Sequence, residues 1–91
     1  QRPFALSLTY ARSARQSTIV NRTISEMSNR GAGSAEQLAP LRTQLERCFP
    51  SVQRGDRITG VSTGANTARF FVNGAQSCQI EWPNFRRHFF G

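Results

Sequence analysis

Few side chains in this sequence are of types that do acid–base, nucleophilic or metal chemistry. The single histidine, His88, lies between Arg87 and Phe89, where no adjacent serine or cysteine forms a nucleophile–base pair with it. One histidine and two cysteines are too few ligands for a Cys/His zinc module. The carboxylates fall in five separate segments, without the spacing of a glycosidase pair or a metal cluster; they are Glu26, Glu36, Glu46, Asp56 and Glu81. We therefore predict no metal site and no cofactor, and the residues by themselves assign no catalytic group.

Cys48 and Cys78 are the remaining reactive candidates. They are either two buried thiols or a disulfide, and neither belongs to a C-x-x-C redox motif. A bridge between them would add roughly 3–4 kcal/mol to the free energy of unfolding. Export from the cell favours the bridge, whereas a reducing compartment favours the thiols. The residues leave both states open.

The basic side chains could bind an anionic partner. All twelve are arginine, and the chain has only five acidic residues, so its net charge is +7. A nucleic-acid module gathers its arginines on one face among aromatic side chains, but these are scattered along the chain and adjacent only at Arg86 and Arg87. No RNA-recognition aromatic pair, KH loop or zinc knuckle is present. We interpret the excess as solvated surface charge, predict no nucleic-acid partner, and keep a basic nucleic-acid-binding module as a second alternative.

One strand and one helix are predicted for the first third of the chain. Residues 4–10 alternate larger apolar residues with small or polar ones, which favours a strand. Residues 13–30 change to a helical period, with Ser13 as the expected N-cap and Gly31 as the residue that ends the helix.

A second helix is predicted over residues 34–49. Ser34 and Gln37 have the spacing of a capping box, and Pro50 ends the segment. Pro40 either kinks the first turn of this helix or marks its true start.

The clearest local signal is a β-hairpin around Asn73-Gly74. Both central positions of such a two-residue turn need a positive φ, which Asn and Gly adopt readily. The expected strands are residues 67–72 and 75–81, in a register that pairs Phe70 with Ser77.

The remaining elements complete the fold class. Residues 57–62 are expected to form a strand in which Gly60 marks a bulge or a close contact. Residues 84–90 are expected to form a last helix. The order strand, helix, helix, three strands, helix predicts an α+β fold with an antiparallel sheet and helices packed on one face. No apolar stretch approaches the ~20 residues that span a bilayer.

Three stretches together resemble the bacterial chalcone isomerase-like family, relatives of plant chalcone isomerase and of plastid fatty-acid-binding proteins. Residues 6–12 read LSLTYAR, a strand ending in a tyrosine and a basic residue. Residues 49–59 read FPSVQRGDRIT, which is similar to the family's FPxxxxGDR strand entry. Residues 69–74 read RFFVNG and residues 85–91 read FRRHFFG, which resemble its hairpin and its final helix.

The family domain is longer than this chain, so the resemblance implies that residues 1–91 are a chalcone isomerase-like domain that is incomplete at the N-terminus and at the C-terminus. It also implies export to the periplasm. If the family's upstream strands are absent, the exposed sheet edge should favour self-association with another chain.

The resemblance argues against efficient chalcone cyclisation. The plant enzymes use a cleft arginine in a segment upstream of this chain, and a tyrosine seven residues before an asparagine near the start of the first long helix. Alignment on Gly31 puts the asparagine position at Arg22, or at Asn21 after a slip of one residue. The tyrosine position then falls on Arg15 or Ala14. We therefore expect a non-catalytic binder of a small apolar acid or lipid, with an intramolecular lyase (isomerase) acting on a chalcone-like substrate as the first alternative.

The expected binding site is the cleft between the sheet and the helices. An arginine there would pair with the acid group of an apolar or aromatic ligand, while phenylalanine and isoleucine side chains would line the apolar part. The competing interpretation is that these apolar residues are core and the arginines are solvated. The candidate ligand-binding residues are Arg15, Asn21, Arg22, Ile24, Arg69 and Phe71.

Overall fold

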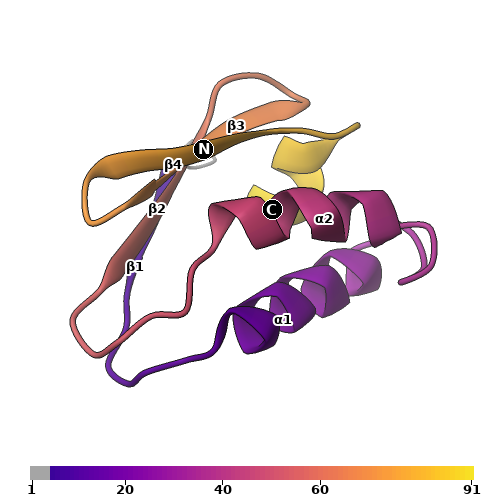
Figure 1. Ribbon diagram of the computed structural model, residues 1–91. Coiled ribbons are helices and arrows are strands. Elements are labelled where there is room, and N and C mark those ends of the chain that lie inside the picture. Colours follow the sequence, from indigo (N-terminus) through magenta and orange to yellow (C-terminus); the bar gives the residue numbers. More distant parts are fainter. Residues whose placement is uncertain (1–4) are drawn as a thin grey trace.

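A computed structural model describes residues 5–91 and confirms the α+β fold. The elements, in chain order, are β1 (Ala5–Thr9), α1 (Gln16–Asn29), α2 (Ala39–Cys48), β2 (Arg57–Ser62), β3 (Thr67–Val72), β4 (Ala75–Glu81) and the short π-helix η1 (Arg86–Phe90). The four strands form one antiparallel sheet in the order β1-β2-β3-β4. Both α-helices lie on the same face of this sheet (Figure 1). Phe4, where the predicted first strand begins, lies outside the described residues.

Helix α1 starts later than the sequence predicts. Ser13 does not cap it; the N-cap position is Arg15, which makes no side-chain capping bond. The backbone N–H of Gln16 instead donates to the hydroxyl of Ser51, 2.9 Å away. The helix buries one apolar stripe in the core, formed by Ile19, Val20, Ile24 and Met27.

Helix α2 also starts later, and Pro40 marks its true start. Ser34 and Gln37 do exchange the two bonds of a capping box, at 2.9 and 3.1 Å. These bonds close a turn that precedes the helix, which begins at Ala39 with a proline in its first turn. Proline fits that position because the first backbone N–H groups of a helix have no helical acceptor.

The hairpin has the predicted turn but a different register. Asn73 and Gly74 have φ values of 51° and 89°, as a two-residue turn requires. Beyond the first two pairs the ladder shifts, so that Phe70 pairs with Cys78 and the predicted pairing with Ser77 is wrong. Ser77 is the extra residue of a bulge, and its hydroxyl donates to the carbonyl oxygen of Cys48 on α2 at 2.9 Å.

The core is centred on Phe70, which points from the middle of the sheet toward the helices. Its ring makes edge contacts with Phe49, Phe85 and Phe89, with centroids 5.1–6.2 Å apart. A Cβ at Gly60 would lie 2.8 Å from this ring, so the glycine marks a close contact and not a bulge. The predicted last helix is shorter than expected, because Asn84 has a positive φ of 57° and the helical turn begins at Arg86.

Candidate functional site

The described chain contains an open groove of about 520 Å³ between the β1–β2 side of the sheet and helix α1. Its floor is apolar and comes mainly from the helix-facing side of the sheet. Its lining includes Leu6, Leu8, Tyr10, Ile58, Phe70, Ile19, Arg22, Met27, Arg30 and Phe89. A volume of this size suits a small organic ligand.

Leu6 and Leu8 form the sheet side of the groove. Leu6 pairs with Gly60 and Leu8 with Ile58, so both leucines lie on the face that also carries Phe70. They are 50% and 54% exposed, although leucine is usually buried in a folded domain. The reason is positional: α2 packs against β4 at the opposite edge, and α1 packs against α2 and η1. Within residues 5–91, neither helix packs closely on β1, and the two leucines remain half-exposed.

The helix side of the groove carries charge. Arg22 and Glu26 on α1 and Arg30, the C-cap residue that follows it, are spaced four residues apart, and all three line the groove. The Nε of Arg22 lies 3.2 Å from a carboxylate oxygen of Glu26, and the two side chains are 81% and 52% exposed. An ion pair so exposed contributes little to stability, so Arg22 can exchange this partner for a ligand at little cost.

Arg30 is held in place at the other end of this row. Its Nη1 donates to the carbonyl oxygens of His88 and Phe89, at 3.1 and 2.7 Å. It therefore ties α1 to the last carbonyl groups of η1.

Tyr10 closes the groove at the end of β1. Its backbone is fixed by two hydrogen bonds: its N–H donates to the carbonyl of Asp56, and its carbonyl accepts from the N–H of Gly55. Burial raises the pKa of the Tyr10 phenol above its ordinary value, and the nearby positive charge of Arg22 partly opposes this effect. The phenol is therefore a neutral hydrogen-bond donor at physiological pH, facing the same groove as a cation.

The six residues predicted to bind ligand do not meet in one place. Arg22 lines the groove, as expected. Ile24 is only 3% exposed and belongs to the core. The side-chain oxygen of Asn21 accepts a hydrogen bond from Arg42 at 2.6 Å, which links α1 to α2. Arg15 is exposed at the start of α1.

Arg69 and Phe71 lie on the opposite face of the sheet from the groove. Successive strand residues alternate between faces, and their neighbour Phe70 points into the core. Phe71 pairs with Thr59 and Arg69 with Val61 on that outer face. Strand alternation alone therefore separates the two residues from the groove.

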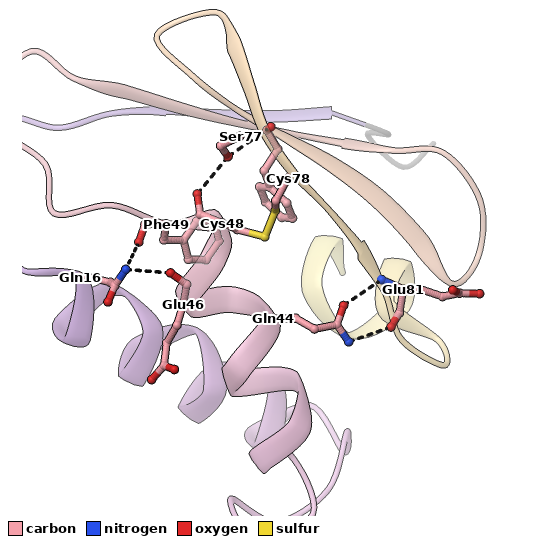
Figure 2. The surroundings of a disulfide bond; sticks show 9 residues. Gln16, Gln44, Glu46, Cys48, Phe49, Ser77, Cys78 and Glu81 are labelled. Atoms are coloured by element: carbon pink, nitrogen blue, oxygen red, sulfur yellow. Dashed lines mark hydrogen bonds between the residues drawn. A yellow bond between two sulfur atoms is a disulfide. The ribbon is translucent and has the colours of Figure 1, made fainter.

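The two cysteines form a disulfide, which settles the alternative left open by the sequence. Figure 2 shows it between the end of α2 and β4, beside the bond from Ser77 to the Cys48 carbonyl. Nearby, the Gln44 side chain accepts from the N–H of Glu81 at 3.2 Å and donates to its carbonyl at 3.1 Å. These contacts attach the end of α2 to β4. Residues 5–91 contain no free thiol.

Among residues 5–91, no group of three or more His, Cys, Asp or Glu side chains is arranged to hold a metal ion. Within the same range no helix has the length and apolar character needed to cross a bilayer. A comparison with known protein families and with curated proteins finds no match to this sequence.

Proposed function

We propose that this chain binds a small apolar molecule with an anionic group in the groove between β1 and α1. The observation that carries the proposal is the pair of half-exposed leucines on the floor of an open groove of ligand size. Leucine side chains left in water lose the stabilisation that burial gives. A ligand lying along Leu6 and Leu8 would recover part of it.

The choice of an anionic ligand rests on Arg22 and Tyr10. A guanidinium and a neutral phenol both donate hydrogen bonds to a carboxylate, and a charge-assisted bond is the stronger kind. Glu26 is the current partner of Arg22, and a ligand carboxylate would compete with it. A fatty acid or an aromatic acid has this combination of an apolar body and one acid group.

This function agrees with the proposed membership in the chalcone isomerase-like family, which rests on the three resembling stretches of sequence. Catalytic cyclisation is the first alternative. Tyr10 supplies the observation in its favour, because a tyrosine does line the groove although the aligned positions, just before α1, hold Arg15 and Ala14. Chalcone-to-flavanone turnover above the buffer rate, followed by absorbance, would support that alternative over simple binding.

The disulfide supports a proposed location outside the reducing cytosol. The periplasm is the compartment that the family resemblance implies. The nucleic-acid alternative predicts binding that weakens steeply with added salt, whereas an apolar acid held mainly by leucines should bind with a shallow salt dependence.

The test uses displacement of a fluorescent apolar anion, anilinonaphthalene sulfonate, by dodecanoic acid and by dodecanol. Both should displace the probe, the acid more strongly. Arg22→Gln should weaken the binding of dodecanoic acid by about threefold to tenfold, since the charge-assisted bond is lost. The affinity for dodecanol should not change. Arg47→Gln, an exposed arginine on α2, is the matched control and should change neither.

Two outcomes would contradict the proposed binding. If neither compound displaces the probe, or if native mass spectrometry after mild purification finds the protein consistently empty, the binding function is wrong. If Arg22→Gln and Arg47→Gln behave alike, the groove is not where the acid group binds.

A further inference from the structure

Among residues 5–91, no backbone group pairs with the outer edge of β1. In an antiparallel strand, the N–H and C=O of alternate residues point to the same side. Both backbone groups of Tyr10 point toward the β2 side, where they bond to Asp56 and Gly55. By the same alternation, the backbone N–H and C=O groups of Leu6 and Leu8 point toward β2, with which these residues pair. The N–H and C=O groups of Ala5, Ser7 and Thr9 therefore point away from the sheet.

This edge lacks the usual devices that prevent strand pairing. Natural edge strands are protected by charged side chains, proline, bulges or a covering helix. Residues 5–9 read ALSLT, without charge or proline, and pair with β2 in an unbroken register. All five residues are exposed. In a chain with a net charge of +7, this strand is the uncharged one at the sheet edge.

We propose that β1 pairs antiparallel with β1 of a second copy of this chain, about a two-fold axis at Ser7. In this register Ser7 lies opposite the partner's Ser7, and Ala5 lies opposite the partner's Thr9. These are the residues whose backbone groups point outward, so each such pair can exchange two hydrogen bonds. If the register between the two β1 strands shifted by one residue, backbone groups that point outward in one chain would lie opposite residues whose backbone groups point toward β2 in the other. The register follows from the backbone alternation alone and does not depend on ligand binding.

The side chains fit the same register. Leu6 lies opposite the partner's Leu8, on the helix-facing side of both sheets, so the leucines that are half-exposed in one chain cover each other in two. The two grooves then join into one apolar surface under a continuous sheet. A second copy suits this edge better than a charged peptide because the strand offers no countercharge. An isologous contact of this kind closes on itself as a dimer.

Sedimentation equilibrium of the full chain over a range of concentrations tests the proposal. We expect a monomer–dimer equilibrium that shifts toward the dimer with added salt, because two chains of charge +7 repel each other. Hydrogen exchange gives the register. The amides of Ser7 and Thr9 should exchange quickly in dilute protein and at least about tenfold more slowly in the dimer, whereas those of Leu6 and Leu8 should be protected in both.

Variants separate edge pairing from a general effect of charge. Ser7→Arg places two guanidinium groups opposite each other and should weaken the dimer by roughly tenfold or more. Gln79→Arg adds the same charge to the same sheet face at the opposite edge and should leave the dimer intact. Ser7→Ala removes only the hydroxyl, which bonds to Thr59 within one chain, and should also leave it intact.

Each contrary outcome overturns the proposal. A protein that stays monomeric at every concentration and salt level does not pair through β1. A dimer that leaves the Ser7 and Thr9 amides unprotected uses another surface. So does a dimer that Ser7→Arg and Gln79→Arg weaken equally.

Discussion

The two outer strands of the sheet differ in how their edges are treated. At β4, a disulfide, a hydroxyl bond from Ser77 and the two bonds from Gln44 attach the strand to helix α2 (Figure 2). At β1, the strand pairs with β2 along one edge and with no other strand of the described residues, and Leu6 and Leu8 are half-exposed. The comparison teaches that the two ends of this sheet are held differently. The β4 end is cross-linked to a helix, whereas the leucines of the β1 end are open to solvent, and both the proposed ligand and the proposed second chain would use this open end.

Removal of the disulfide should have the largest effect on this difference. Replacing both cysteines by alanine should lower the free energy of unfolding by about 3–4 kcal/mol, since the bridge constrains the unfolded chain between residues 30 apart. Urea denaturation of the oxidised protein and of the double variant measures the loss. Exchange of the Glu81 amide should speed up, while the exchange of Leu8 relative to global unfolding stays the same. If the two forms unfold at the same urea concentration, β4 is not anchored by the bridge.

The next largest effect is the difference in stability lost when an apolar side chain is truncated at each edge. Ile80 on β4 is fully buried, whereas Leu8 on β1 is 54% exposed. Ile80→Ala should cost about 3 kcal/mol of stability, because it leaves a cavity, and Leu8→Ala less than about 1 kcal/mol. Denaturation midpoints give both values. In contrast, Leu8→Ala should weaken probe binding in the groove and Ile80→Ala should not. Equal losses of stability would mean that β1 is as well packed as β4.

The smallest effect is a pH dependence at Asp56, beside the end of β1. The backbone N–H of Gln53, 2.8 Å from the Asp56 carboxylate, and then the side-chain amide of Asn73 hold the pKa of Asp56 below its ordinary value. A folded-state pKa below the unfolded one stabilises the fold above the unfolded value of about 4, and this contribution disappears as the pH falls through the lower folded value.

Because the Asp56 carbonyl accepts the N–H of Tyr10, acid should loosen the end of β1 before it affects β4. Exchange of the Tyr10 amide between pH 5 and pH 2, corrected for the intrinsic rate, measures this loosening. Asp56→Asn should flatten the dependence. Glu36→Gln, a control at an exposed carboxylate elsewhere, should keep it. A Tyr10 amide whose protection does not change with pH would contradict the prediction.

Features determined by local sequence could be predicted well. Asn73-Gly74 formed the expected turn because its positive φ values are a property of those two residues. The capping-box bonds of Ser34 and Gln37 also formed. The helix starts at Ala39, five residues after Ser34. This later start did not follow from the capping-box signal, because Pro40 decided between two starts that local preferences left open.

Features determined by tertiary contact could not be predicted. The bulge at Ser77 arises from its bond to the Cys48 carbonyl, a contact between segments that are distant in sequence. The predicted site placed Arg69 and Phe71 with Arg22, although strand alternation puts these two strand residues on the face opposite to their buried neighbour Phe70. The same alternation would have identified the groove residue Tyr10, which follows Leu6 and Leu8 at a period of two. Which of the two faces lines the groove depends on where α1 and α2 pack, and the sequence pattern alone does not determine this.

The position of the disulfide along the chain has a topological consequence. Taken as a covalent graph, the molecule is a closed ring from Cys48 to Cys78 with two tails. The ring contains β2 and β3, while α1 and β1 belong to the amino-terminal tail. Among residues 5–91, strand β1 is held to the ring by its ladder of hydrogen bonds with β2 and by the hydroxyl bond between Ser7 and Thr59, so it can detach while β2, β3 and β4 stay paired. A fluctuation of this kind would open the groove from the side, without unfolding the protein.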